Sequence, residues 1–240
     1  MSDNLPALSG NLLDALPVPA QPVDDSQFEE MAKRGNFLSR LVLYSKQGEV
    51  LDGKIGPGQY GIPTSKESLT VIGNKVDLIP LARRVKAIDM SDRNNIVESY
   101  DPSSDVFNDI KDRSSVKDSG CMYGISFLCI ERTTGKFVEW YCGSKTTRAV
   151  AGQIYPYLPV GAAEAAQRGI EPRNPTPFTM GVELIESKGY KWHGPTVKGC
   201  STPFNNVPSP EATISEIQKF LNPKTATTSV AADGAEDDDR

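Results

Sequence analysis

Alternating apolar and polar residues recur along this chain in short stretches, and this pattern predicts more strands than helices. The strongest pair is 121–131 and 136–142. Both stretches are apolar, and the RTTG segment between them is typical of a hairpin turn that ends at Gly135. Two further pairs are expected to be joined near Pro80 and at Lys188-Gly189. The first of these pairs is expected over 69–79 and 83–90, and the second over 177–187 and 190–198. One further strand is expected over 38–46.

Helical patterns are fewer and shorter. Ser26 and Ser144 each stand where a side chain can cap the start of a helix. With no repeat of fixed period and no βαβ alternation, the sequence predicts a mainly β fold with minor α. This would be an OB-like or Greek-key barrel with long loops, short helices and disordered acidic termini. The predicted helices cover 26–34, 144–158 and 211–221, and the predicted long or irregular loops cover 48–66, 92–119 and 159–175.

Charge is segregated along the chain, and the net value of -5 conceals this. Residues 1–30 hold six acidic residues and no Lys or Arg. Residues 225–240 hold five acidic residues and one Arg, so the body between the two ends carries +5. The small and polar composition of both ends predicts disorder. We therefore expect a flexible acidic segment over 1–25, a single β-rich domain over 26–222, and a disordered acidic tail over 223–240.

The four cysteines form no CxxC pair, and the chain has a single histidine. A structural zinc site needs four ligands in paired spacing, so we expect reduced, buried cysteines and no metal or other cofactor. No run of about 18 apolar residues predicts a membrane-spanning helix. The N-terminus lacks the basic and then apolar segments of a secretory signal. These features together favour a cytoplasmic protein.

Three motifs suggest other chemistry, but each lacks a necessary part. Asn74, Lys75 and Asp77 match the NKxD guanine-specificity motif of GTPases, but no phosphate loop precedes them. The segment Ser144-Lys145-Thr146-Thr147 either contacts an anion at a helix N-terminus or only caps that helix. His193, the sole histidine, has no GxSxG serine to activate. The sequence therefore offers no named nucleophile or base, and we do not expect an enzyme.

Aromatic and cationic residues share faces of the predicted strands, as they do in proteins that bind single-stranded nucleic acid. Tyr44 follows Arg40 at even spacing, and Tyr190 and Trp192 share the face of another strand. Rings stack on bases for ~1–3 kcal/mol per base while Lys and Arg follow the phosphates; the alternative for each ring is a place in the core. The predicted nucleic-acid-binding residues are Arg40, Tyr44, Lys46, Lys54, Tyr60, Arg83, Arg84, Lys86, Lys136, Trp140, Lys145, Arg148, Tyr190, Lys191 and Trp192.

The chain resembles the phage-type single-stranded DNA-binding proteins over about residues 37–204 and at its end. The segments that carry the resemblance are FLSRLVLYSKQGEV, KVDLIPLARRVKAIDM, ISFLCIERTTGKFVEWYCGSKTT, FTMGVELIESKGYKWHGPTV and the terminal AEDDDR. The resemblance implies a basic OB-type barrel that binds and protects single-stranded DNA, without sequence preference, in replication and recombination. It also implies a place in the cytoplasm of a bacterial host cell.

Charge and resemblance together suggest the partners. Single-stranded DNA is expected first, with RNA left open, and no membrane partner is expected. The acidic tail would compete with phosphates for the basic body and, once released, recruit a basic partner such as a replication protein. The sequence leaves open whether the protein forms a homo-oligomer. The alternative function is a non-enzymatic virion or assembly component. A third is an enzyme with an unfamiliar site that uses His193 or a buried carboxylate. Salt-sensitive binding to single strands distinguishes the first two.

Overall fold

The computed structural model describes residues 38–45, 55–63, 69–92, 95–204, 206–223 and 227–229. Several sequence-based predictions lie outside these residues. They are the helix over 26–34, the site residues Lys46 and Lys54, and the disorder of the acidic segments 1–25 and 230–240.

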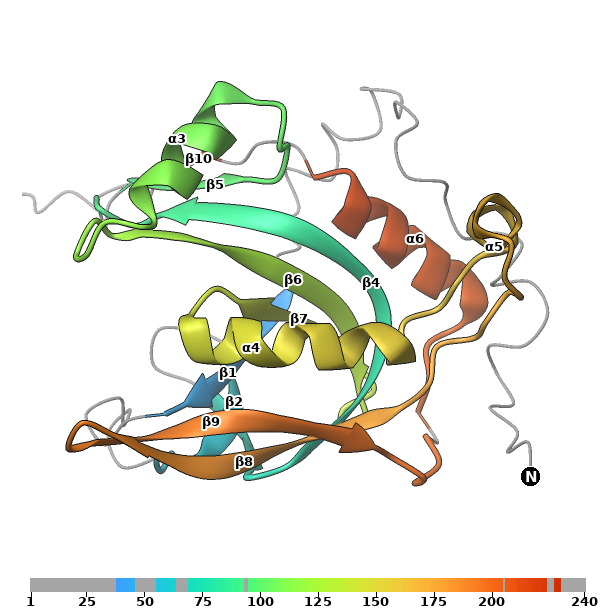
Figure 1. Cartoon of the computed structure of the whole chain (residues 1–240). Helices are drawn as coiled ribbons and strands as arrows, with labels where there is room; N and C mark the ends of the chain where they lie inside the picture. Colours follow the sequence, from blue (N-terminus) through green and yellow to red (C-terminus); the bar gives the residue numbers. More distant parts are fainter. Residues whose placement is uncertain are drawn as a thin grey trace, which may run out of the picture. The chain divides into compact units, whose positions relative to one another are not determined.

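The described residues form a mainly β structure with 44% strand and 24% helix, which confirms the predicted fold class (Figure 1). The strands are β1 (Ser39–Tyr44), β2 (Gln59–Pro63), β3 (Leu69–Gly73), β4 (Val76–Asp89), β5 (Asn95–Ser99), β6 (Cys121–Glu131), β7 (Phe137–Cys142), β8 (Phe178–Ser187), β9 (Tyr190–Gly199) and β10 (Thr227–Ser229). The helices are α3 (Asp105–Arg113), α4 (Lys145–Ile154), α5 (Ala162–Arg168) and α6 (Pro210–Leu221), with the 3₁₀ turn η2 (Tyr155–Tyr157).

The chain divides into two compact units. The first is Met1–Arg84 with Ile125–Asn222, and the second is Val85–Gly124 with Pro223–Arg240. The second unit is therefore an insertion between the first part of β4 and the last part of β6, completed by the C-terminal residues. The expectation of one domain over 26–222 stays a prediction.

The sheet of the first unit is strongly curled into a half-barrel. Its strand order is β4-β6-β7-β1-β2-β3, and β8 pairs with both β4 and β9. The pairs β6–β7 and β8–β9 are antiparallel, whereas β1 runs parallel to β7. Beyond the end of β1, the backbone N–H of His193 in β9 donates to the carbonyl oxygen of Ser45 at 3.0 Å. The imidazole lies so close to Gly58 (φ +78°) that a Cβ there would be 2.8 Å from His193 Cδ2.

Each face of the curled sheet carries its own apolar cluster, and one helix covers each (Figure 1). Inside the curve, Phe127, Cys129 and Trp140 pack with Ala151 and Ile154 of α4. Alternation along the strands turns their neighbours to the outer face. There Leu128, Ile130 and Ile79 pack with Ile217 and Phe220 of α6. The strands β6 and β7 are consequently covered on both faces.

Local sequence explains where α4 begins. Ser144 is its N-cap, and the Ser144 hydroxyl accepts a hydrogen bond from Thr147 N at 3.1 Å. The Thr147 hydroxyl in turn accepts one from Ser144 N at 3.1 Å, which completes a reciprocal capping box. These bonds satisfy two donors that would otherwise have no partner. The predicted helix over 144–158 is confirmed through Ile154, after which the 3₁₀ turn follows.

The second unit consists of the end of β4, β5, α3, the start of β6 and β10. Phe107 and Ile110 of α3 are buried against Ala87 and Cys121. Burial alone would raise the pKa of Asp89. Hydrogen bonds from Ser91 and the guanidinium of Arg113 outweigh it and hold that pKa at about 2.

Several loops predicted from the sequence contain regular structure. The segment 48–66 includes β2, the polar stretch 92–119 includes β5 and α3, and 159–175 includes α5. The predicted break near Pro80 is wrong, because β4 continues through Pro80 and the chain turns at Gly73 (φ +117°) instead. Proline has no N–H to donate to a neighbouring strand. Pro80 lies between the stretches of β4 that pair with β8 (Val76–Leu78) and with β5 (Ala87–Asp89).

Candidate nucleic-acid interface

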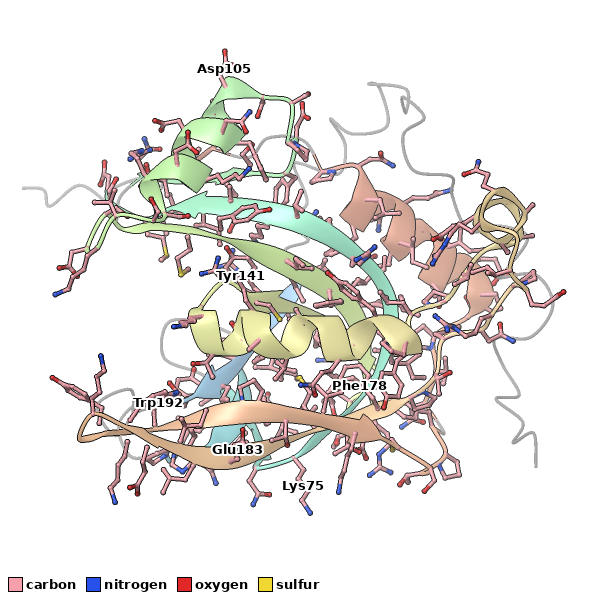
Figure 2. The ribbon with its side chains drawn as sticks, in the orientation of Figure 1. Lys75, Asp105, Tyr141, Phe178, Glu183 and Trp192 are labelled. Carbon is pink, nitrogen blue, oxygen red and sulfur yellow. The ribbon has the colours of Figure 1, made fainter. Side chains whose placement is uncertain are left out.

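The strand β9 carries two aromatic side chains on the face that meets α4. Tyr190 is 76% exposed, the largest exposure among the described large apolar residues. Trp192 is half-buried, and its indole Nε1 donates to Thr146 Oγ1 of α4 at 3.3 Å. Figure 2 shows Trp192 on the hairpin beside the N-terminal end of α4. Tyr190 and Trp192 are two residues apart, so they share this face, as the sequence predicted.

The β8–β9 turn holds this face in register. Lys188 (φ 49°) and Gly189 (φ 80°) both adopt positive φ, which a two-residue type I′ hairpin turn requires. Ser187 pairs with Tyr190 directly after the turn, and Ile185 pairs with Trp192. The hairpin thus places Tyr190 at the start of β9 and Trp192 one step inward, against the helix.

Two cations occupy the N-terminal part of α4. Lys145 and Arg148 are exposed, and neither has a carboxylate within 4 Å among the residues that the structure describes. Cations are unfavourable at this end of a helix, where the macrodipole is positive and carboxylates would stabilise. The first turn of α4 has no acidic residue. Lys145, Arg148, Tyr190 and Trp192 together form what we call the hairpin–helix surface.

Lys191 lies on the opposite face of β9. It pairs across the hairpin with Glu186, and the Lys191 ammonium is 2.6 Å from a Glu186 carboxylate oxygen. Both side chains are more than half exposed, so the ion pair adds little stability. Because residues directly opposite share a face, exposed Leu184 lies on this side as well, opposite His193. The predicted residue Lys191 is therefore not part of the hairpin–helix surface.

Comparison with family models, with curated proteins and with solved structures found no match for this chain. The assignment of a function therefore depends on the site itself. Among the residues with a described structure, no helix combines the length and apolar character needed to cross a membrane. Nor do three or more His, Cys, Asp or Glu side chains gather, within the same residues, into a group that could hold a metal ion.

Three predicted ring contacts need correction, because Tyr44, Tyr60 and Trp140 are buried. Tyr60 is 0% exposed, and its hydroxyl donates to the carbonyl oxygen of Gly181 at 2.9 Å. Its ring meets Trp140 edge-on, with centroids 5.9 Å apart. Burial, with the nearby Cys142 thiol, raises the pKa of Tyr60. The alternation of apolar and polar residues predicted which side chains share a strand face. It did not indicate that this face is buried in the core.

Two predicted cations hold the fold together instead of facing solvent. Arg84 donates to the Phe220 carbonyl oxygen at 2.5 Å and to Glu139 Oε1 at 3.1 Å. Lys86, in the second unit, is 1% exposed, and its ammonium lies 3.1 Å from Glu98 Oε2. Both charges are compensated within the protein, so neither is available to a phosphate.

The remaining predicted cations are exposed. They do not lie on β9 or α4, so they do not belong to the hairpin–helix surface. Arg40 lies 4.0 Å from Glu139, and Lys136 precedes β7. Arg83 is exposed on β4, and its guanidinium carbon lies 4.1 Å from the centroid of the Tyr155 ring. Sequence reasoning missed Tyr155, although its place near the end of the predicted helix, directly before Pro156, could have indicated a fixed ring.

The two nucleotide-like motifs have structural roles. Asn74 and Lys75 form the turn between β3 and β4. Asp77 accepts a hydrogen bond from Thr179 at 2.6 Å and lies 2.9 Å from Arg132 Nε, so it is engaged within the sheet. In the segment that begins at Ser144, the Thr147 amide is already satisfied by the cap.

Proposed function

We propose that this protein binds single-stranded nucleic acid, with DNA as the first ligand, through the hairpin–helix surface. One observation carries the proposal. A highly exposed tyrosine and a fixed tryptophan share a strand face beside two cations that have no carboxylate partner in the described structure. The proposed role is the protection of single strands in replication and recombination, as the resemblance to phage-type single-stranded DNA-binding proteins implies.

The chemistry of this surface suits a ligand with flat bases and a charged backbone. Every base has a π-face, so stacking on Tyr190 and Trp192 would tolerate any sequence. The Thr146 hydrogen bond holds the indole in place, which reduces the entropy lost on binding. Lys145 and Arg148, together with the positive end of the α4 dipole, would attract the phosphates.

The order of elements also supports this location. An OB-fold is a five-stranded, partly open Greek-key barrel. Its ligands contact the face of the second and third strands and the loops joining strands 1–2 and 4–5. With β4, β6, β7, β8 and β9 as the five strands, the loop between the last two is the Lys188-Gly189 turn. The second and third strands, β6 and β7, are covered by α4 and α6. The β8–β9 turn is then one of the two loops that contact ligands in such a fold.

The acidic tail has a proposed regulatory role. Residues 225–240 carry five acidic residues and one Arg, and a flexible anionic chain competes with phosphates for cations. Competition would suppress weak binding, and a bound single strand would release the tail to a basic replication partner. Because β10 (Thr227–Ser229) pairs with β5, the tail is better tested by neutralising its charge than by removing it.

Fluorescence anisotropy of a labelled oligothymidine, titrated with the full chain at low and high salt, tests the proposal. We expect submicromolar binding at low salt that weakens as salt rises, because phosphate contacts release counterions. Replacing Tyr190 with Ser should weaken binding about 5- to 150-fold, which corresponds to ~1–3 kcal/mol of stacking. Replacing Asp237, Asp238 and Asp239 with Asn should tighten it.

Matched variants separate stacking from general surface effects. Tyr190→Phe keeps the ring and should bind as the natural chain does. Leu184→Ser removes an exposed apolar residue from the other face of the same hairpin and should have no effect. If the full chain does not bind at low salt, the proposal is wrong. The exposed hairpin would then fit an assembly component better.

A further inference from the structure

The exposed side of α4 leads from the hairpin–helix surface to a second cation–aromatic pair. At the far end of the helix, the Arg83 guanidinium lies 4.1 Å above the Tyr155 ring. Tyr155 follows Ile154 directly and packs against Phe127, with centroids 6.1 Å apart. The core therefore holds the ring from one side while Arg83 covers it from another.

Arg83, Lys145 and Arg148 differ from the basic residues that the fold pairs with a carboxylate. About half of the described basic side chains, Arg84 and Arg132 among them, lie within 4 Å of a carboxylate. These three have no such partner within the described ranges, and they flank the two ends of one helix. Cations that the fold does not neutralise remain free to contact a polyanion.

We propose that a bound single strand continues from the hairpin–helix surface along the exposed side of α4 and ends at the Arg83–Tyr155 pair. This inference rests on the proposed function and adds its second anchor point. Lys145 and Tyr155 are ten residues apart, so the helix separates them by about 15 Å. With the hairpin added, the path suits a short site, at the lower end of the ~4–16 nucleotides that one OB-fold binds. Arg83 would contact a phosphate, and the edge of Tyr155 would contact a base.

Gly152 lies midway along this path and allows a clean test. It is exposed, and a Cβ placed on it would meet nothing within 4 Å among the described residues. Glycine is also a poor helix former, so Ala, Gln or Glu at this position should keep or increase stability. A loss of binding in such variants would not come from misfolding, and a thermal melt by circular dichroism confirms this for each.

The experiment measures anisotropy of labelled oligothymidine with the full-length variants. Gly152→Glu places a negative charge on the proposed path and should weaken binding at least 10-fold. Gly152→Gln has the same size without charge and should have a smaller effect, and Gly152→Ala should have none. Arg83→Gln should lower the slope of log affinity against log salt by about 0.7, the value for one lost single-strand phosphate contact. Arg168→Gln, an exposed and ion-paired arginine in α5, serves as its control.

The outcomes distinguish this inference from the proposed function. If Tyr190→Ser weakens binding while Gly152→Glu and Arg83→Gln bind normally, the strand does not follow α4 and the function stands. If Gly152→Glu and Gly152→Gln weaken binding equally, bulk alone is responsible and the charged path is wrong. If the natural chain does not bind, both proposals fail together.

Discussion

The buried ion pair between Arg84 and Glu139 allows the most direct test of how the first unit is held together. The Glu139 carboxylate is 5% exposed and accepts from Ser126 Oγ at 2.6 Å and from Arg84 Nη2 at 3.1 Å. The Arg84 side chain is 11% exposed, and its guanidinium carbon lies 4.0 Å from the centroid of the Phe220 ring of α6. Arg84 also donates to the last turn of α6 through the Phe220 carbonyl oxygen.

Replacing one residue of the ion pair should lower the free energy of unfolding far more than replacing both. In Glu139→Leu, the buried Arg84 guanidinium loses the Glu139 carboxylate, and the loss of one partner of a buried ion pair costs about 3–5 kcal/mol. Arg84→Met leaves the Glu139 carboxylate with Ser126 and with Arg40, which is 4.0 Å away, and should cost a similar amount or less. The double variant buries two apolar side chains in place of the pair, and exchanges of this kind are often neutral. Its cost should fall well below the sum of the two single costs.

Urea unfolding followed by circular dichroism gives the three free energies for this double-mutant cycle. Each single variant should also lower the melting temperature by about 6–20 °C, given ~2–4 °C per kcal/mol for a chain of this size. Glu164→Ala breaks the exposed pair with Arg168 and should change little. If the Arg84 and Glu139 costs add within about 0.5 kcal/mol, the pair is not coupled and the reasoning fails.

Three further predictions concern the thiols, a buried tyrosine and a carboxylate. Burial raises the pKa of Cys142 to about 12, and the other core thiols are also buried. Only half-exposed Cys200 should therefore react quickly with a disulfide reagent near pH 8, and fast reaction of two or more thiols would contradict this. Tyr60→Phe should cost about 1–3 kcal/mol in urea unfolding, because Gly181 loses its buried donor, while oligothymidine binding stays unchanged. The pKa of Asp89 is about 2, so its stabilisation is complete above about pH 4 and lost as the pH falls toward 2. Asp89→Asn should make the free energy of unfolding less dependent on pH in that range. An unchanged dependence on pH would refute this prediction.

Elements with strong local signals could be predicted from the sequence. Gly135 (φ 66°) and Gly189 (φ 80°) mark the two hairpins because each turn needs positive φ. Ser144 marks the start of α4 through its capping box. β2 had no such signal, because its Gly- and Pro-rich sequence is held by pairing with β1 and β3 and by the burial of Tyr60. Its formation depends on residues distant in the sequence.

The residues of the candidate site show the same difference between local signals and contacts with distant residues. The shared face of Tyr190 and Trp192 could be predicted, since strand geometry fixes it. Trp140 follows the same rule, but α4 covers its face, and nothing local in the sequence signals a helix packing there. Arg84 looked available because its partner Glu139 lies 55 residues further along the chain, and Lys86 because its partner Glu98 belongs to the neighbouring strand β5. Charge pairing of this kind depends on tertiary structure.

The protein contains one histidine, and it lies where β9 approaches the residue that follows β1. His193 is fixed there by its backbone bond to Ser45 and by the close approach of its ring to Gly58. A proton spectrum of this protein therefore holds one imidazole spin system, and its assignment needs no mutagenesis. That signal reports on the contact between β9 and the end of β1. Binding at the nearby Trp192 could be followed through it in solution without any added label.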